Sequence, residues 1–166
     1  MDRSKTRLII LVGIPGSGKS TWIKNNKDKY LGKTKVISRD EIRFALVAED
    51  EDYFSKEKEV YKEFIRQIKE GINEHYDTIF VDATHFNRGS RTKLLRSLGS
   101  SLKGVEVNAV VIRPSLEITL AQNAQRTGRK FVPENIIKDY YNKFEIPSEE
   151  EGFDEIWIYE GDINIL

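Results

Sequence analysis

The chain has 166 residues, a length that suits one domain with a sizeable core, and its formal net charge is zero. It contains no cysteine, which excludes disulfides and thiolate metal ligands. The first apolar run, LIILV at 8–12, is too short to cross a bilayer and lacks a signal-peptide cleavage pattern. We therefore expect a single cytoplasmic domain over 1–166, with no membrane and no disulfide partner.

Charge is unevenly distributed along the chain. Residues 1–43 include 11 basic and 4 acidic side chains, whereas residues 134–166 include 2 basic and 10 acidic ones. This polarity is compatible with an anionic ligand near the N-terminal half. It is equally compatible with a solvated surface whose charges serve no ligand.

Apolar, β-branched runs alternate with amphipathic helical patterns. Strands are expected at 7–13, 34–38, 77–84, 105–112 and 153–160. Helices are expected at 19–26, 39–50, 56–75, 88–98, 114–126 and 132–144. The alternation predicts an α/β protein with a parallel sheet and helices on both faces.

The segment GIPGSGKST follows the first strand and fits the P-loop pattern G-x-x-x-x-G-K-[ST]. Its glycines let backbone N–H groups turn inward around phosphate oxygens. Lys19 would bring positive charge to the transferred phosphate, and the Ser20 hydroxyl would bind Mg²⁺. The residues expected to bind ATP here are Gly13, Pro15, Gly16, Ser17, Gly18, Lys19, Ser20 and Thr21.

The P-loop predicts nucleotide binding but not the reaction. The guanine-reading motif N-K-x-D of GTPases is absent from the sequence, and large ATPases need a longer chain. A small domain with a P-loop near its N-terminus favours a kinase, although the choice between ATP and GTP stays open.

The acceptor side needs a carboxylate that orients a hydroxyl group and takes its proton. Asp40 in ISRDEIR directly follows the second strand, at the sheet edge where parallel sheets place their sites. Arg43 follows one helical turn later and could hold the acceptor. Alternatively, Asp40 caps the helix and Arg43 merely pairs with it.

Asp82 ends the third strand in TIFVDATH, which is a Walker B pattern. It would fix a Mg²⁺-bound water or orient an arginine on the acceptor, unless it only caps the following segment. Thr84, His85 and Arg88 follow at the same edge and are expected to contact the acceptor. A lone loop histidine is, however, more often structural than catalytic.

The segment AQRTGRKFVP places Arg126, Arg129 and Lys130 around a glycine between two helices. This composition is typical of a lid that closes over the triphosphate. A basic loop without such a role would have the same composition. Which of Arg126 and Arg129 approaches the phosphates is left open by the sequence.

Together, GSGKSTW, RDEIR, VDAT and the arginine-bearing lid ending in VP resemble the 5′-polynucleotide kinase family of phage and bacterial repair enzymes. The resemblance implies a P-loop kinase fold with strand order 2-3-1-4-5 and transfer of the ATP γ-phosphate to 5′-hydroxyl ends of RNA or DNA. It implies Asp40 as general base, Lys19 and Arg126 on the donor phosphates, and Arg43 and Asp82 on the acceptor side.

Two features depart from that family. Its members usually have asparagine where this sequence has His85, and many add a 3′-phosphatase domain whose D-x-D-x-T motif is absent here. Phosphorylation of ends without trimming is therefore expected. The basic segment RGSRTKLLR at 88–96 could steer an acceptor strand, or form an ordinary solvated helix face.

Two other functions are compatible with these residues. One is a small P-loop kinase that phosphorylates a metabolite or the amino acid of a charged tRNA. The other is a regulatory module that binds a nucleotide without turnover, which the presence of Asp40 disfavours because a pure binder needs no base. Oligomeric state stays open, since the tail at 158–166 could form a strand edge or a subunit contact.

Overall fold

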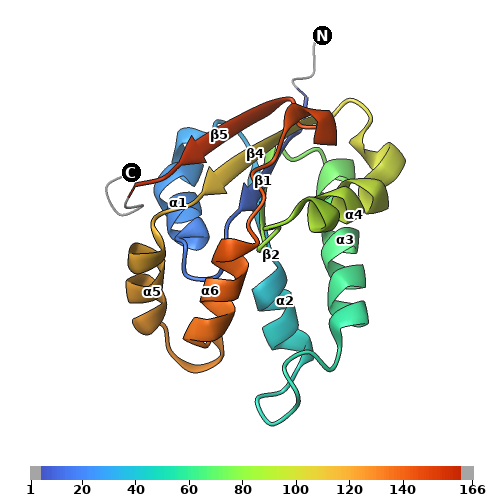
Figure 1. The fold of residues 1–166 in the computed structure, drawn as a ribbon. Helices are drawn as coiled ribbons and strands as arrows, with labels where there is room; N and C mark the ends of the chain where they lie inside the picture. Colours follow the sequence, from blue (N-terminus) through green and yellow to red (C-terminus); the bar gives the residue numbers. More distant parts are fainter. Residues whose placement is uncertain (1–4, 162–166) are drawn as a thin grey trace.

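The computed structural model describes residues 5–161, so most of the expected C-terminal tail lies outside the described residues. Five parallel strands form one sheet in the order β2-β3-β1-β4-β5, which confirms the predicted architecture (Figure 1). The strands are β1 (Arg7–Val12), β2 (Thr34–Ser38), β3 (Thr78–Asp82), β4 (Glu106–Ile112) and β5 (Glu155–Tyr159).

Helices follow the strands in alternation. They are α1 (Lys19–Asn26), α2 (Arg39–Leu46), α3 (Glu57–Asn73), α4 (Arg88–Leu98), α5 (Leu116–Ala124) and α6 (Glu134–Asn142). Short 3₁₀ turns, η1 to η4, occupy Lys27–Lys29, Gly99–Leu102, Gly128–Lys130 and Glu149–Glu151. No helix in the described part of the chain is long and apolar enough to span a bilayer.

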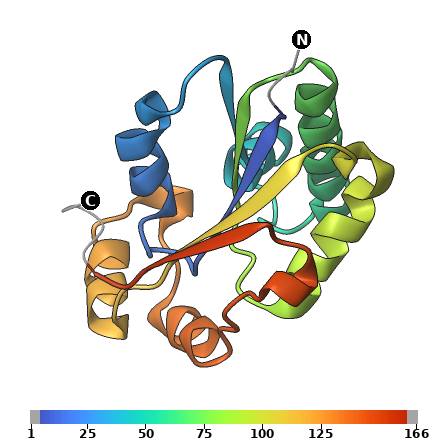
Figure 2. The ribbon, with the colours of Figure 1, turned by 90° about the horizontal axis from the view of Figure 1, so that it is seen from above.

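The sheet separates two hydrophobic cores (Figure 2). On one face, helices α3 and α4 bury apolar residues spaced by about one turn, such as Phe64, Ile68 and Leu94. On the other face, α1 contributes Trp22, which is 2% exposed and packs edge-on against Phe80 of β3. The three central strands, β1, β3 and β4, are therefore buried on both sides, as expected within a parallel sheet, whereas the edge strands β2 and β5 are partly exposed.

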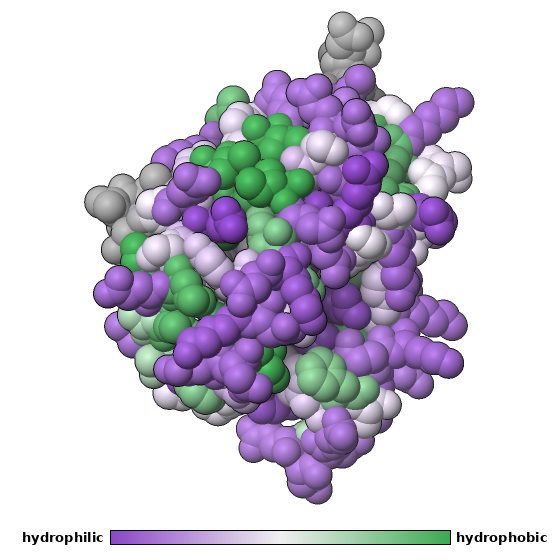
Figure 3. All heavy atoms as spheres, in the orientation of Figure 1, coloured by the Kyte–Doolittle hydropathy of each residue, from purple (hydrophilic) through white to green (hydrophobic). Residues whose placement is uncertain are grey.

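Helix α2 is shorter than the sequence pattern predicts. It ends at Leu46 because Val47 adopts extended backbone angles, and the backbone N–H of Ala48 donates to the Glu51 carboxylate instead of continuing the helix. The residues that follow form an exposed acidic connection to α3, defined here as the 47–56 connection. In Figure 3, hydrophilic side chains cover the lower end of the molecule, where this connection lies.

The carboxyl ends of the parallel strands meet at one edge of the sheet, from which α1, α2 and α4 begin (Figure 1). Strand register places Ser38 opposite Asp82, and Val12 of β1 opposite Val111 of β4. Helices α5 and α6 lie beyond the same edge. The P-loop and the predicted acceptor residues are thereby brought together, as expected for open α/β sheets.

Candidate active site

The turn between β1 and α1 is built as a phosphate cradle. The backbone N–H of Gly13 donates to Thr84 O at 3.0 Å, which ties the loop to the segment after β3. A Cβ atom at Gly13 would stand 2.5 Å from Ser17 Oγ and 2.7 Å from Ile112 O, so only glycine fits. Gly18 has φ +108° and begins α1, whose N-terminus favours an anion. The turn therefore has the conformation of a phosphate-binding loop.

The ammonium of Lys19 lies inside this loop. It donates hydrogen bonds to Gly13 O at 2.9 Å and to Ile14 O at 3.2 Å. Burial lowers the pKa of Lys19; the nearby charges of Asp82 and Asp40 act to raise it, and that of Arg126 acts to lower it. The Lys19 ammonium therefore interacts electrostatically with Asp82, Asp40 and Arg126, the three charged groups expected around the reacting phosphate.

Ser20 and Asp82 form the clearest candidate for the metal side of the site. Ser20 Oγ donates a hydrogen bond of 2.6 Å to Asp82 Oδ2. In P-loop enzymes this pair, a hydroxyl after the lysine and a strand-end aspartate, holds Mg²⁺. Asp82 therefore contacts the P-loop serine in this structure, and the helix that follows is capped by the Asn87 side chain instead.

Asp40 is held by a network at the start of α2. Arg43 Nη1 donates to Asp40 Oδ1 at 2.7 Å, and the Tyr53 hydroxyl donates to the same oxygen at 3.3 Å. Half of the Asp40 side chain is exposed, whereas Arg43 is only 8% exposed. The helix is capped by Ser38, whose Oγ accepts from Glu41 N, so Asp40 does not serve as the cap.

The Arg43 guanidinium is engaged in hydrogen bonds within the domain. Its Nε and Nη2 atoms donate to Glu57 at 2.5 and 3.0 Å, and Nη1 also donates to Tyr53 at 3.2 Å. Burial acts to lower the pKa of Arg43, but the hydrogen bonds to Glu57 and Tyr53 raise it overall. In this structure Arg43 positions Asp40, and its contact with an acceptor stays a prediction.

Sequence reasoning missed both Glu57 and Tyr53. They lie 14 and 10 residues from Arg43, in segments that read as a charged helix start and an acidic connection. No motif marks such partners, because they meet Arg43 only when α3 packs beside α2.

His85 is not placed where a substrate could reach it. The residue is 6% exposed, and its ring stacks on Phe64 at a centroid distance of 6.1 Å. Burial is the main cause that lowers the pKa of His85 to about 3, so the imidazole is neutral. The structure thus gives His85 a packing role beneath the loop in place of the expected acceptor contact, because its ring is buried against Phe64.

The other two residues of this loop take different positions. Thr84 is half-buried and contributes its carbonyl to Gly13. Arg88 is exposed as the first residue of α4, free to meet an acceptor. The loop is fixed from below by Arg91, which donates to His85 O at 2.9 Å and forms a fully buried ion pair with Glu151 at 2.7 Å.

Additional positive charge gathers on the acceptor side. Arg39 and Lys93 lie over the ring of Tyr61, with Arg39 Cζ at 5.2 Å and Lys93 Nζ at 4.3 Å from its centroid. Arg39 also donates to Glu57 at 3.2 Å. Glu57 therefore has to balance two arginines, which leaves net positive charge between α3 and α4.

The two lid arginines point in different directions. The charge of Arg126 contributes to lowering the pKa of Lys19, and the buried Arg126 Nη1 has no hydrogen-bond partner among the described residues. Arg129 instead donates to Val47 O at 2.6 Å and stacks over Phe44, at the end of α2. The expectation that Arg129 binds the nucleotide is therefore not matched by its position, because its guanidinium is already engaged by α2.

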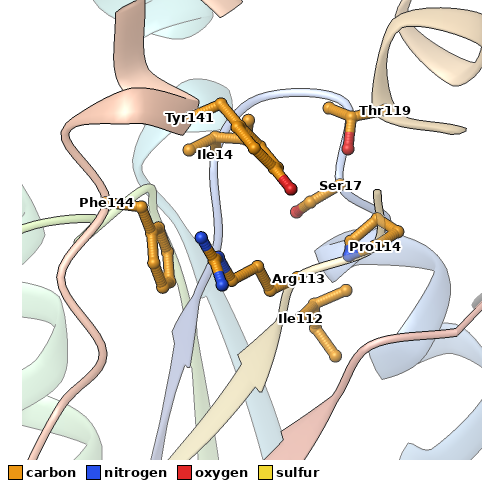
Figure 4. A pocket seen from close by; sticks show the side chains of 8 residues that line it. All are labelled: Ile14, Ser17, Ile112, Arg113, Pro114, Thr119, Tyr141 and Phe144. Atoms are coloured by element: carbon orange, nitrogen blue, oxygen red, sulfur yellow. The ribbon is translucent and has the colours of Figure 1, made fainter. Parts of the chain in front are cut away.

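A small pocket lies behind the P-loop (Figure 4). Its volume is about 10 Å³, too small for any part of a nucleotide. Arg113 lies 5.3 Å from the ring centroids of both Tyr141 and Phe144 there, and Ser17 faces the same space. This packing supports the cradle from α6 and is no substrate site.

These features are those expected of a P-loop kinase: a phosphate cradle, a hydrogen-bonded serine–aspartate pair, a lid arginine and a positioned carboxylate. The chain therefore has the fold and the phosphate-binding loop of a nucleoside triphosphate binding domain. It belongs to the AAA domain family, whose model matches residues 8–147.

Comparison with known proteins places this chain near several kinases. The L-seryl-tRNA(Sec) kinase of Methanococcus maripaludis is 32% identical over 157 residues, which cover 89% of this chain and 56% of the relative. The chain thus spans about half of that relative's length. These matches support the P-loop fold that the sequence shares with polynucleotide kinases. They do not identify a polynucleotide as the acceptor.

Two solved structures share the fold. A putative kinase from Chloroflexus aurantiacus has a TM-score of 0.73 at 12% identity, over 99% of this chain and 93% of that one. A chain of the Pnkp1/Rnl/Hen1 RNA repair complex has a TM-score of 0.70 at 18% identity, over 86% and 45%. At these identities the likeness establishes the fold alone.

Proposed function

We propose that this protein transfers the γ-phosphate of ATP to the hydroxyl group of an amino acid esterified to tRNA, with seryl-tRNA as the first candidate. One observation carries the proposal: the Asp40 carboxylate, fixed by Arg43, stands at the same sheet edge as Lys19 and the Ser20–Asp82 pair. Donor and acceptor groups thus share one site.

The residues divide the reaction between them. Mg²⁺, held by Ser20 and Asp82 together with the nucleotide phosphates, would neutralise charge on those phosphates. Lys19 leaves the loop carbonyls to bind the transferred phosphate. Asp40 orients the acceptor hydroxyl and takes its proton as the new O–P bond forms and the bond to the ADP oxygen breaks.

Asp40 is suited to this role by its hydrogen bonds. Arg43 and Tyr53 both donate to Oδ1, and among the described residues no hydrogen bond reaches Oδ2. Burial and the neighbouring Asp40 carboxylate raise the pKa of Tyr53, so its hydroxyl stays a donor. One oxygen is therefore anchored and the other is available to the acceptor.

Two observations favour an aminoacyl acceptor over a 5′-hydroxyl strand end. The relative with 32% identity is named for seryl-tRNA. In addition, the 47–56 connection beside Asp40 exposes Glu49, Asp50, Glu51 and Asp52. Their negative charge would attract the ammonium group of an amino acid, which a 5′-hydroxyl strand end lacks.

The second candidate is the 5′-hydroxyl end of RNA or DNA. It is supported by the combination of RDEIR with VDAT and by the exposed basic residues Arg88, Lys93 and Arg96 on α4. A strand leaving the site between α3 and α4 would meet these charges, and avoid the acidic connection.

One acceptor panel separates the candidates. The protein would be incubated with Mg²⁺, γ-labelled ATP and either seryl-tRNA, the same tRNA without serine, 5′-hydroxyl RNA, 5′-hydroxyl DNA or free serine. Mild base then cleaves the ester bond of charged tRNA. We expect label only with seryl-tRNA, released by base as phosphoserine. Base-stable label on RNA or DNA oligonucleotides would establish the second candidate instead, and absence of label from the tRNA, the RNA and the DNA alike would refute both.

A further inference from the structure

The lid, defined as residues 125–133 between α5 and α6, is attached to the rest of the domain at two points. At its base, the Asn123 side chain donates to Val132 O at 2.6 Å and accepts from Val132 N at 3.1 Å. Asn123 also packs against Gly16, where an added Cβ would stand 3.1 Å from its own. The base of the lid therefore rests directly on the P-loop.

At its tip, the lid is attached to α2 through Arg129. Arg129 Nη1 donates to Val47 O at 2.6 Å and Nη2 to Phe44 O at 3.5 Å, while the guanidinium lies 4.7 Å from the Phe44 ring centroid. The carbonyl of Phe44 has lost its helical donor, because Ala48 N binds Glu51 instead. Arg129 therefore serves as a cap for α2.

The contact between Arg129 and the end of α2 matches the chemistry of a helix C-terminus. The last carbonyls of a helix lack intrahelical donors and form the negative end of its dipole, so a cation with several N–H groups suits them. The neighbouring Lys130 makes only a 3.9 Å ion pair with Glu41 between two exposed side chains. Arg126 lies between the two attachment points, and its buried Nη1 has no hydrogen-bond partner among the described residues.

We propose that Arg129 is a positioning residue for phosphoryl transfer: by capping α2 it holds the lid closed and sets Arg126 over the phosphate cradle. Because α2 also carries Asp40, the same contact fixes the position of Arg126, on the donor side, relative to Asp40, on the acceptor side. The proposal goes beyond the choice of acceptor, since it concerns the donor phosphates and can be tested without an acceptor.

The test measures binding of ADP alone and of ADP with aluminium fluoride, both with Mg²⁺. Arg129→Gln should weaken the aluminium fluoride complex by about tenfold and leave ADP affinity within about twofold, because positioning counts most in the transition state. Lys130→Gln removes a positive charge one position along the lid, and should change neither the affinity for ADP nor the affinity for ADP with aluminium fluoride. Arg129→Lys keeps the charge but loses the fork of donors, so an intermediate loss is expected.

A double variant distinguishes positioning from an independent contact. If Arg129 acts through Arg126, then Arg126→Gln with Arg129→Gln should lose no more affinity for the aluminium fluoride complex than Arg126→Gln alone. Chymotrypsin cleavage after the exposed Phe131 should also accelerate in Arg129→Gln, in the presence of that complex. Additive losses, or equal losses for ADP and its fluoride complex, would overturn the proposal.

A final comparison addresses folding. We expect the thermal midpoint of Arg129→Gln to lie only slightly below that of Lys130→Gln, since a helix cap is lost while the core is untouched. If Arg129→Gln lowered the midpoint and Phe131 cleavage stayed slow, Arg129 would have a purely structural role and the proposal would fail.

Discussion

The hydroxyl of Ser20 donates a 2.6 Å hydrogen bond to the carboxylate of Asp82, across 62 residues of sequence. The contact forms because β1 and β3 are neighbours in the sheet and end at the same edge. With its proton directed to Asp82, the Ser20 oxygen keeps its lone pairs for a cation, and the adjacent carboxylate adds negative charge.

This relationship predicts a change in magnesium dependence. Asp82→Asn removes the charge but keeps the size of the side chain, and should raise the Mg²⁺ concentration needed for half-maximal turnover by about 10- to 100-fold. A magnesium titration of ATP turnover measures this. Asp82→Glu should recover part of the loss, and an unchanged titration curve would assign Asp82 to the acceptor instead.

The Asp40 carboxylate should be needed for transfer but not for nucleotide binding. We expect Asp40→Asn to lower kcat by about 10²- to 10⁴-fold because the proton acceptor is lost. Equilibrium binding of ATP should stay nearly unchanged. The control is Glu41→Gln, which neutralises the next, more exposed carboxylate on the same helix. Strong residual transfer by Asp40→Asn would contradict its role as base.

The buried His85 should make stability depend on pH. Its pKa, lowered to about 3 by burial, lies below the unfolded value of about 6.5. Between these two pH values the unfolded chain binds one more proton than the folded chain. The stability that depends on neutral His85 is therefore fully present above pH 6.5. It is lost as the pH falls towards 3, by about 1.4 kcal/mol per pH unit.

Urea unfolding at pH 7, 6 and 5 tests this dependence. His85→Asn removes the titrating ring, and asparagine tolerates the left-handed backbone, so the loss of stability on acidification should become smaller. His75→Asn is the matched control, because His75 also has a positive φ but is exposed. Equal pH profiles for wild type and His85→Asn would refute the assignment.

The buried pair between Arg91 and Glu151 should be the most sensitive ionic contact in the fold. Their side chains are 1% and 2% exposed, so Glu151→Gln leaves a buried guanidinium without its counter-charge. We expect a loss of about 3–5 kcal/mol in the free energy of unfolding, measured by urea denaturation. Arg66→Gln, which breaks exposed pairs with Glu63 and Glu70, should change the free energy of unfolding far less, because water screens these pairs. Similar losses in the two variants would contradict this.

The sequence predicted the features that depend on local pattern. The alternation of apolar strands and amphipathic helices determines a parallel sheet, and a strand followed by GIPGSGKST determines the phosphate cradle. Asp40 and Asp82 could be assigned to the same edge because each directly follows a strand of that sheet. These inferences need only short segments and the general rules of α/β topology.

The choice of partners was decided by the tertiary structure. Arg43 turned to Glu57, His85 into the core and Arg129 to the carbonyls of α2, and none of these contacts has a sequence signal. Each depends on how helices pack beside one another, which sets distances of a few ångströms between residues 14 to 82 positions apart. The sequence by itself therefore determined an α/β domain with a phosphate-binding loop, whereas packing decided which charged groups are engaged by their neighbours and which remain available at the sheet edge.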